Sequence, residues 1–192
     1  MTETNGSLQT SIVHRRAESP ADGDRFDAVY RDHVGYVLHS LRRLGVDERD
    51  VEDVAHDTFL VVARKLDEYD TARPLRPWLF GIAFRVALDH RRSARVRRER
   101  LDVPQQTQDA VDDRPAADLQ VERTQARRLI VAALDTMRPE LQAVFILHDL
   151  DEVGMPEIAQ ALEIPLNTSY SRLRIARAQF EAAVRELSRG EA

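Results

Sequence analysis

Apolar residues recur at helical spacing in the first quarter of the chain. Because an α-helix turns once about every 3.6 residues, apolar side chains three and four positions apart line one face. From Asp24 onward this spacing runs through Phe26, Val29, Tyr30, Val34, Val37, Leu38, Leu41 and Leu44, and Gly45 then ends it. Glycine directly after a periodic run is a common helix stop. The pattern therefore predicts a helix over residues 24–44.

Two more helices are predicted in the same part of the chain. After Val46, acidic residues occupy the first turn, where the helix dipole favours negative charge. An apolar stripe follows at Val51, Val54, Phe59, Val62 and Leu66. The segment DTARPLRP (70–77) contains two prolines, which interrupt a helix. A third helix is expected from Trp78, apolar at first and strongly basic toward residue 100.

Helical spacing resumes in the second half of the chain. It is present in VERTQARRLIVAALDTM (121–137), ELQAVFILHDL (140–150), MPEIAQAL (155–162) and NTSYSRLRIARAQFEAAVREL (167–187). No stretch has a strong strand pattern, so we expect an all-α protein with two small helical domains, each of about 65 to 75 residues. The expected divisions are a disordered tail (1–22), a first domain (23–98), a linker (99–122) and a second domain (123–188).

The stretch MPEIAQALEIPLNTSYSRLRIAR (155–177) has the pattern of a helix-turn-helix. Its first helix would supply Ile158 and Leu162 to the interior, with the small Ala159 where the second helix crosses. We expect Asn167 or Thr168 to cap the second helix. The turn position that usually holds glycine, for its positive φ, is Glu163; a non-glycine residue adopts that conformation only at a cost.

The second helix of this motif separates into two faces. At about 100° per residue, Ser169, Leu173, Ala176 and Phe180 form the expected core face, and Ser171, Arg174, Ile175 and Ala178 lie opposite. Tyr170 and Arg177 fall on one flank and Arg172 on the other. This chemistry suits the base edges and phosphates of a DNA major groove. Two alternatives remain open: the helix could be a solvated surface helix, and Tyr170 could pack at the edge of the core.

Charge is strongly segregated along the chain. The formal net charge of −5 argues weakly against nucleic-acid binding. However, RRSARVRRER (91–100) carries six arginines against one glutamate, whereas residues 101–121 carry five aspartates against one arginine. A dense arginine run attracts phosphates. The acidic stretch lacks sustained periodicity and is typical of a linker.

Several classes of chemistry are disfavoured. The chain contains no cysteine, which excludes disulfides and thiolate metal sites. Its six histidines show no ligand-like pairing, and no glycine-rich phosphate loop is present; His148 falls near a predicted helix end, where a dipole-compensating role is the simpler reading. We therefore expect no enzyme activity, no cofactor and no metal.

The apolar runs fall short of the roughly 20 residues that span a bilayer, and the N-terminus lacks a signal-peptide pattern, so a cytoplasmic protein without membrane insertion is predicted.

Three ordered motifs resemble the extracytoplasmic-function (ECF) sigma factors of bacterial RNA polymerase. DVEDVAHDTFLVVARKLDEYD (50–70) is similar to the family's core-binding helix, and PWLFGIAFRVALDHRR (77–92) to its WLxxIAxNxALDxxR helix. PEIAQALEIPLNTSYSRLRIAR (156–177) resembles xEIAxxLGIPxGTVKSRLxRAR. The resemblance covers about residues 24–97 and 124–187, and implies sigma regions two and four joined by a flexible linker.

The resemblance also implies three binding surfaces. The core-polymerase surface, which would dock on the clamp coiled coil of the largest polymerase subunit, comprises Glu52, Asp53, His56, Asp57 and Phe59. The minus-ten residues, which would melt and read the DNA, are Tyr69, Arg73, Trp78, Arg85, His90, Arg91 and Arg92. The minus-thirty-five residues, which would read duplex DNA, are Thr168, Ser169, Tyr170, Ser171, Arg172, Arg174 and Arg177.

The sequence departs from the family pattern at several of these positions. His56 replaces the usual glutamine, and Phe84-Arg85 stand where Arg-Asn is common. Ser169-Tyr170 replace Val-Lys, and Ile175 replaces an arginine. The loss of two positive charges should shift the recognition helix from phosphate attraction toward apolar contact, for example with thymine methyl groups.

The resemblance predicts a promoter-specificity subunit that uses no cofactor. Its partners would be the polymerase core, promoter DNA and an anti-sigma factor. In the family the linker threads the RNA path of the polymerase, where negative charge could imitate nucleic acid; a simple soluble tether is the alternative.

Two other functions stay open: a helix-turn-helix regulator that does not replace the sigma subunit, and a sigma-like decoy. The VEDVAHDTF helix (51–59) argues against the regulator, and the arginines at 85, 91, 92, 172, 174 and 177 argue against the decoy.

Overall fold

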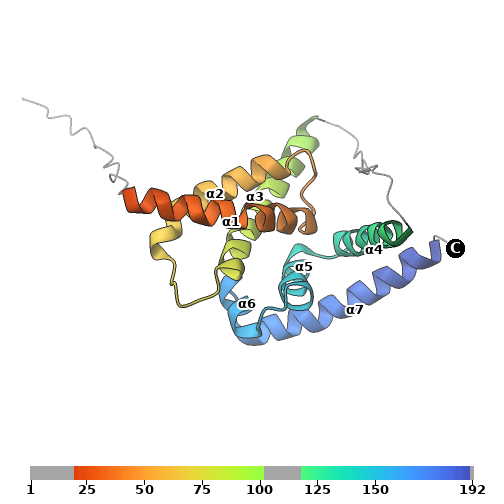
Figure 1. Cartoon of the computed structure of the whole chain (residues 1–192). Helices are drawn as coiled ribbons and strands as arrows, with labels where there is room; N and C mark the ends of the chain where they lie inside the picture. The colour runs from red at the N-terminus through yellow and green to blue at the C-terminus, as the bar shows by residue number, and fades with distance from the viewer. Residues whose placement is uncertain (1–19, 102–117, 191–192) are drawn as a thin grey trace, which may run out of the picture.

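The computed structural model describes residues 20–101 and 118–190, which form two groups of helices without a strand. The first helical group contains α1 (Pro20–Arg43), α2 (Val51–Lys65), the short turn η1 (Leu66–Glu68) and α3 (Leu75–Leu101). The second contains α4 (Asp118–Asp135), α5 (Pro139–Phe145), η2 (Ile146–Leu150), α6 (Met155–Ala161) and α7 (Leu166–Gly190). Figure 1 shows both groups, and the all-α prediction is confirmed.

The first helical group closes around an apolar core that α1, α2 and α3 share. The side chains of Val37, Leu41, Leu79 and Phe80 are fully buried there. Complete burial of a large apolar side chain contributes roughly 1.5–3 kcal/mol. Gly45 lies in the left-handed region at φ 73°, where it ends the α1 segment as its position predicted. The three-helix core thus holds α3 in a fixed orientation beside α2.

The start of α3 differs from the prediction. We expected the two prolines of residues 70–77 to precede the helix, but α3 begins at Leu75 and takes Pro77 into its first turn. A proline there is tolerated because the first N–H groups of a helix have no intrahelical partner. The helix therefore starts three residues before Trp78 and carries this tryptophan within its first turns.

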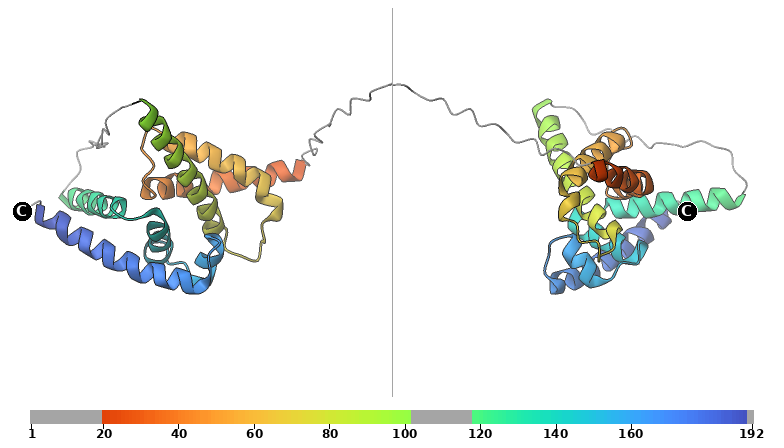
Figure 2. Two further views of the ribbon diagram at one scale, coloured as in Figure 1. Left: turned by 180° about the vertical axis from the view of Figure 1, so that it is seen from behind. Right: turned by 60° about the vertical axis from the view of Figure 1, so that its left-hand side comes forward.

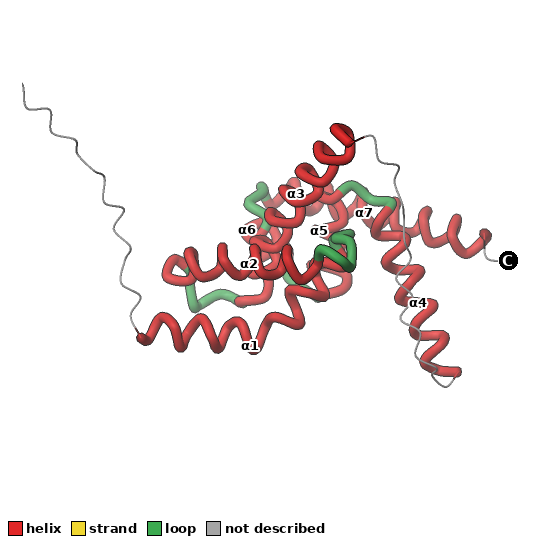
Figure 3. Tube along the Cα trace, turned by 90° about the horizontal axis from the view of Figure 1, so that it is seen from above, coloured by secondary structure: helices red, strands yellow, loops and turns green. Residues whose placement is uncertain are grey.

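The second helical group is organised by α7, which packs against α4, α5 and α6. Leu134, Ile146, Leu147 and Ile158 are fully buried in its core. Between α5 and α6, η2 has the wider π-helical geometry, which often occurs where a chain must reorient functional side chains. In Figure 3, α4 and the C-terminal part of α7 extend away from α1.

Three helix boundaries lie inside segments predicted to be tail or linker. Helix α1 begins at Pro20 rather than after residue 22, α3 ends at Leu101 rather than at residue 98, and α4 begins at Asp118 rather than after residue 122. Proline and aspartate both favour the first turn of a helix, which explains the earlier starts. Residues 1–19, 102–117 and 191–192, with most of the predicted tail and linker, lie outside the described residues.

The two groups also pack directly against each other. The principal contact joins α3 to α6, and both views of Figure 2 show α6 at one end of α3. No helix within residues 20–101 and 118–190 is long and apolar enough to cross a membrane.

Candidate nucleic-acid and polymerase interfaces

An acidic stripe lies on the exposed face of α2. Glu52, Asp53, His56 and Asp57 are all solvent-exposed, as the helical spacing predicted. Phe59 is only 3% exposed, so its assignment to the docking surface is corrected. The residue that continues the stripe is Leu60, which is exposed. Residues 53, 56, 57 and 60 are three and four apart, so helical spacing alone could have identified this leucine.

Phe59 is buried because it belongs to the apolar stripe of α2. Its ring contacts Tyr30 of α1 edge-on, with ring centroids 4.7 Å apart, and Phe26 at 6.4 Å. Such edge-to-face pairs add stabilisation beyond area burial. Tyr30 is 45% exposed and covers Phe59 from the solvent side. Phe59 therefore packs beneath the acidic stripe and is not exposed for contact with a partner.

An aromatic pair marks the loop between η1 and α3. The ring centroids of Tyr69 and Trp78 lie 4.9 Å apart, and both side chains remain partly exposed. The Tyr69 hydroxyl donates to the Arg73 carbonyl, and Arg73 pairs with Asp70 at 3.0 Å. The loop thus holds two aromatic rings and one guanidinium together at the N-terminus of α3.

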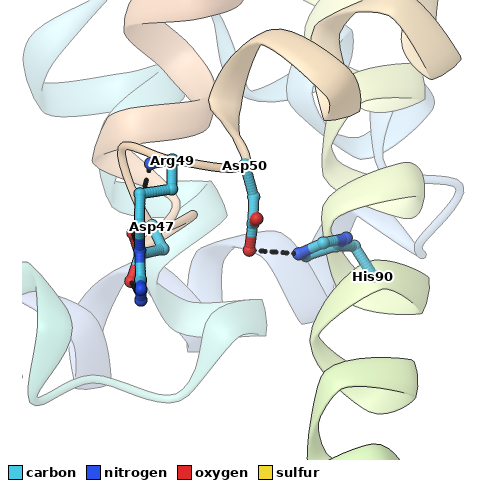
Figure 4. A network of polar contacts seen from close by, with 4 residues as sticks. All are labelled: Asp47, Arg49, Asp50 and His90. Carbon is cyan, nitrogen blue, oxygen red and sulfur yellow. Dashed lines mark hydrogen bonds and ion pairs between the residues drawn. The ribbon is translucent and has the colours of Figure 1, made fainter. Parts of the chain in front are cut away.

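The predicted minus-ten residues on α3 point in different directions. Trp78, Arg85 and Arg92 are seven residues apart and so lie on one stripe. His90 points instead toward the start of α2, where its Nε2 lies 3.1 Å from Asp50 Oδ2 (Figure 4). Arg91 donates to the Leu44 carbonyl at 3.2 Å. His90 and Arg91 therefore fasten α3 to the α1–α2 turn.

The same turn is stiffened by a second polar contact. Arg49 pairs with Asp47 through its side chain at 3.0 Å, and the Arg49 backbone N–H donates to the same carboxylate at 3.1 Å (Figure 4). Asp50 follows directly and is the N-cap residue that precedes α2. The turn thus fixes the position from which Asp50 reaches His90.

The helix-turn-helix prediction agrees with the arrangement of α6 and α7. Glu163 adopts φ 55°, the left-handed conformation expected at the turn. The caps differ from the prediction: α7 begins at Leu166, and the Pro165 carbonyl accepts the N–H groups of Thr168 and Ser169. Asn167 and Thr168 therefore lie in the first turn of the helix and are not its cap.

The faces of α7 are largely as predicted. Leu173, Ala176 and Ser169 are buried, and Phe180 stacks on Phe145 with centroids 4.4 Å apart. Because Ser169 is fully buried and donates its hydroxyl to the Leu166 carbonyl at 2.6 Å, it cannot reach DNA. Its assignment to the minus-thirty-five set is corrected.

The outer face of α7 is open to solvent. Tyr170 is 56% exposed, which excludes the alternative that it packs at the edge of the core. Ile175 and Arg174 are exposed on the same side. Within the described part of the chain, Arg172 and Arg174 form no hydrogen bond or ion pair. These side chains are therefore available to a ligand.

A polar hollow of about 480 Å³ adjoins this face. Its lining includes Arg138 and Glu140 from the start of α5 and Thr168, Ser171, Arg172 and Ile175 from α7. Sequence reasoning missed Arg138, although an arginine directly before a helix-initiating proline could have drawn attention to it. Two guanidinium groups and two hydroxyls around one hollow can bind an oxyanion.

Arg177 has a different environment from the other arginines of α7. Its Nε and Nη2 donate to the two Asp149 carboxylate oxygens at 2.9 and 2.6 Å. Asp149 also lies 2.7 Å from His148 Nδ1. The hydrogen bond from Arg177, against the opposing effect of burial, lowers the pKa of Asp149 below its usual value. Arg177 is thus bonded to Asp149 of η2. His148, which was predicted to lie near a helix end, is part of the same cluster.

No group of three histidine, aspartate or glutamate side chains is arranged to hold a metal ion within residues 20–101 and 118–190.

The comparisons with known proteins identify both helical groups. Residues 29–97 match the family model Sigma-70 region 2, and residues 127–180 match Sigma-70, region 4. The chain is 32% identical over 161 residues to the ECF RNA polymerase sigma factor SigL of Mycobacterium tuberculosis, covering 83% of this chain and 89% of SigL. It is 29% identical over 181 residues to the RNA polymerase sigma factor NccH of Alcaligenes xylosoxydans xylosoxydans, covering 93% and 96% of the two chains.

A solved structure supports the same fold. It shows the sigma factor RpoE in complex with the anti-sigma factor NepR from Bartonella quintana, and matches this chain with a TM-score of 0.60 and 17% identity. The match covers 84% of this chain and 98% of RpoE. Together with SigL and the two family models, these findings show that the chain belongs to the ECF sigma factors of RNA polymerase.

Proposed function

We propose that this sigma factor binds the polymerase core with α2 and reads two promoter elements, one with each helical group. The outer face of α7 is the observation that carries the proposal. It presents Tyr170, Arg172 and Arg174 beside a polar hollow, and the two guanidinium groups have no partner among the described residues. A helix with this face fits the major groove of B-DNA.

The minus-thirty-five element is read by α7. Arg172 and Arg174 supply hydrogen-bond donors for guanine edges or phosphates, whereas Tyr170 and Ile175 supply apolar contact where related sequences carry charge. Arg138 lies across the hollow from Arg172 and adds a phosphate contact from outside the helix-turn-helix. Phosphate contacts fix the register of α7, and its outward side chains select bases.

The minus-ten element is read at the start of α3. Tyr69 and Trp78 form a partly exposed aromatic pair, and base–aromatic stacking can hold an unpaired nucleotide. Arg73 adds a neighbouring positive charge, and the exposed Arg92 continues the same stripe of α3. His90 and Arg91 act as positioning residues, because both are bonded within the first helical group.

The polymerase core docks on the acidic stripe of α2 with Leu60 at its end. Four exposed polar or acidic side chains beside one exposed leucine combine electrostatic attraction with apolar contact.

An anti-sigma factor is proposed as a further partner, supported by the RpoE–NepR complex. We also propose that the chain acts in the cytoplasm by binding alone, without catalysis or a cofactor.

Run-off transcription tests the proposed function. Purified chain and core polymerase from the same organism are incubated with genomic fragments, and initiation from specific fragments without any other sigma factor is the expected result. Dependence of all transcription on a second sigma factor would identify the chain as a helix-turn-helix regulator.

The docking surface is tested with a charge reversal. Asp53→Arg should weaken core binding at least about tenfold, since it places a positive charge in the centre of the acidic stripe. Glu186→Arg, with the same charge change at an exposed position of α7, is the matched control. Equal binding by both variants would exclude this face of α2.

A further inference from the structure

The loop between η1 and α3 is organised by the side chain of Asp70. Its Oδ1 accepts the backbone N–H of Ala72 at 3.0 Å, and its Oδ2 lies 3.0 Å from Arg73 Nε. The Asp70 carbonyl also accepts the Arg73 backbone N–H at 3.1 Å, which closes the turn. An aspartate that bonds a backbone N–H two residues further on forms a local turn without help from other elements. One residue thus fixes both the backbone of the loop and the guanidinium that the loop carries.

The same turn determines where the Tyr69 ring lies. The Tyr69 hydroxyl donates to the Arg73 carbonyl, so the ring is bonded to the residue that Asp70 holds. The Tyr69 backbone N–H donates to the Leu66 carbonyl at 3.3 Å, which connects it to η1. Pro74 follows Arg73 and fixes one backbone dihedral angle of the loop. Tyr69 is therefore held both at its backbone and at its hydroxyl.

Trp78 is the other ring of the aromatic pair, and its position does not depend on the loop. It lies near the start of α3 and packs against the apolar core. The planes of the Tyr69 and Trp78 rings are inclined at 43°, so the rings form an open wedge instead of a flat stack. The helix sets the position of one ring, whereas the loop sets the position of the other. An unpaired base can contact both rings only if the loop keeps Tyr69 in place.

The charge of Asp70, taken alone, is unfavourable for DNA binding. Its side chain is 52% exposed and lies beside the rings that are proposed to contact the minus-ten element. A negative charge at this place repels DNA phosphates, and its ion pair with Arg73 also weakens the attraction that this arginine exerts on them. Any benefit of Asp70 to DNA reading must therefore come from the order that it gives the loop. The two effects have opposite signs, so removal of the carboxylate distinguishes them.

We propose that Asp70 is a positioning residue for the reading of the minus-ten element, because it orders the loop before DNA binds and so presents a formed pair of rings to an unpaired base. The inference rests on the proposed reading of this element at the start of α3. A loop that becomes ordered only when the base arrives loses conformational entropy at that step, and the loss weakens binding. With Asp70 in place, this entropy is lost during folding. Asp70 acts through Ala72, Arg73 and Tyr69 and does not itself contact DNA.

A matched set of charge removals tests the proposal. Asp70→Ala removes the carboxylate, whereas Asp70→Asn keeps an oxygen for the Ala72 N–H and loses only the ion pair. Glu68→Gln is the control, since it removes the same charge from an exposed position of η1 two residues away. The chain contains a single tryptophan, so the fluorescence of Trp78 reports on the aromatic pair without any label.

Quenching of Trp78 fluorescence by acrylamide measures the order of the loop in the free chain. Displacement of the Tyr69 ring leaves the Trp78 ring more accessible to the quencher. We expect the quenching constant to rise by about half or more in Asp70→Ala, by less in Asp70→Asn and not at all in Glu68→Gln. The same quenching constant in the parent and in Asp70→Ala would show that Asp70 does not order the loop, and the proposal would be wrong.

The affinity of the holoenzyme for promoter DNA measures whether this order serves reading. The probe is a fragment that supports run-off transcription, prepared with its minus-ten region unpaired. Holoenzyme with Asp70→Ala should bind it at least about fivefold more weakly than the parent, although a negative charge has been removed. Asp70→Asn should lie between the two, and Glu68→Gln should bind as tightly as the parent or more tightly. Binding by Asp70→Ala as tight as that by Glu68→Gln overturns the proposal.

A duplex that carries only the minus-thirty-five element separates a local effect from a general one. All variants should bind this duplex equally, because the loop is not part of the α7 surface. A similar loss on both probes in Asp70→Ala would assign the effect to the fold and overturn the positioning role. If the parent holoenzyme transcribes no fragment, the proposed function itself fails, and the role of Asp70 in reading fails with it.

Discussion

The bidentate pair of Arg177 and Asp149 leads to a prediction opposite to that of the sequence resemblance. Arg177→Ala should reduce the stability of the protein and leave DNA binding nearly unchanged, because both carboxylate oxygens already hold its guanidinium. The control is Arg174→Ala, which removes an exposed guanidinium that has no partner among the described residues. The two variants carry the same charge change on the same helix.

The expected magnitudes follow from the geometry of the pair. The Arg177 side chain is 50% exposed and Asp149 is 20% exposed, so solvent screening reduces a bidentate contact to about 1 kcal/mol. In a domain of roughly 70 residues, this corresponds to a fall in Tm of about 4–8 °C. A lost phosphate contact changes the slope of log affinity against log salt concentration by about 0.9. We therefore expect a lower Tm for Arg177→Ala and a shallower salt slope for Arg174→Ala.

Thermal melting and DNA-binding anisotropy at several salt concentrations measure both quantities on the full chain. A shallower salt slope with an unchanged Tm in Arg177→Ala would refute the reasoning. Acid pH offers an independent check. Arg177 lowers the pKa of Asp149 in the folded state. The ion pair therefore stabilises the fold at pH values above the pKa of an unfolded aspartate, about 3.9. This stabilisation is lost as the pH falls through the pKa of Asp149 in the folded protein. The Tm difference between the parent and Arg177→Ala should therefore shrink below about pH 4.

Three further outcomes are expected. Phe80→Ala removes a fully buried ring and should destabilise the first helical group by about 3–5 kcal/mol, measured by denaturant unfolding; a change below about 1 kcal/mol would exclude the described core. Tyr170→Lys should steepen the salt slope of DNA binding by about 0.9, and an unchanged slope would place Tyr170 away from phosphates. Arg138→Ala should weaken binding to all sequences equally, whereas a loss confined to one base pair would make Arg138 a base-reading residue.

Helical periodicity predicted α2 and α7 well because each of them has one regular buried face, whereas residues 141–145 of α5 and residues 79–84 of α3 are buried on all sides. The inward position of Leu173 and the exposure of Tyr170 both follow from their place on α7. Phe59 belongs both to the family motif and to the apolar stripe of α2, and the stripe decides its burial. Ser169 likewise lies within the family motif, but its rotation about the axis of α7 turns it toward the core.

Contacts between the two helical groups could not be predicted from sequence. Gly81 has no local signal, since its requirement arises only when the Ala161 carbonyl approaches from another part of the chain. Arg85 and Glu163 form an ion pair at 3.1 Å but are 78 positions apart in the sequence, and nothing in either local pattern identifies the other as a partner. Such pairings depend on the arrangement of whole helices, which single-helix periodicity does not determine.

The π-helical geometry of η2 has a consequence for chimaeric sigma factors. Asp149 and Asp151 lie only two residues apart, yet one holds Arg177 within the second helical group and the other accepts the Tyr36 hydroxyl and the Arg43 guanidinium of α1. Deletion of one residue from η2 would favour a regular α-helix and rotate the following chain by about 100°. Asp151 could then no longer face α1. A chimaera that exchanges promoter-reading helices between relatives must therefore take η2 intact and match it to an α1 that carries both Tyr36 and Arg43.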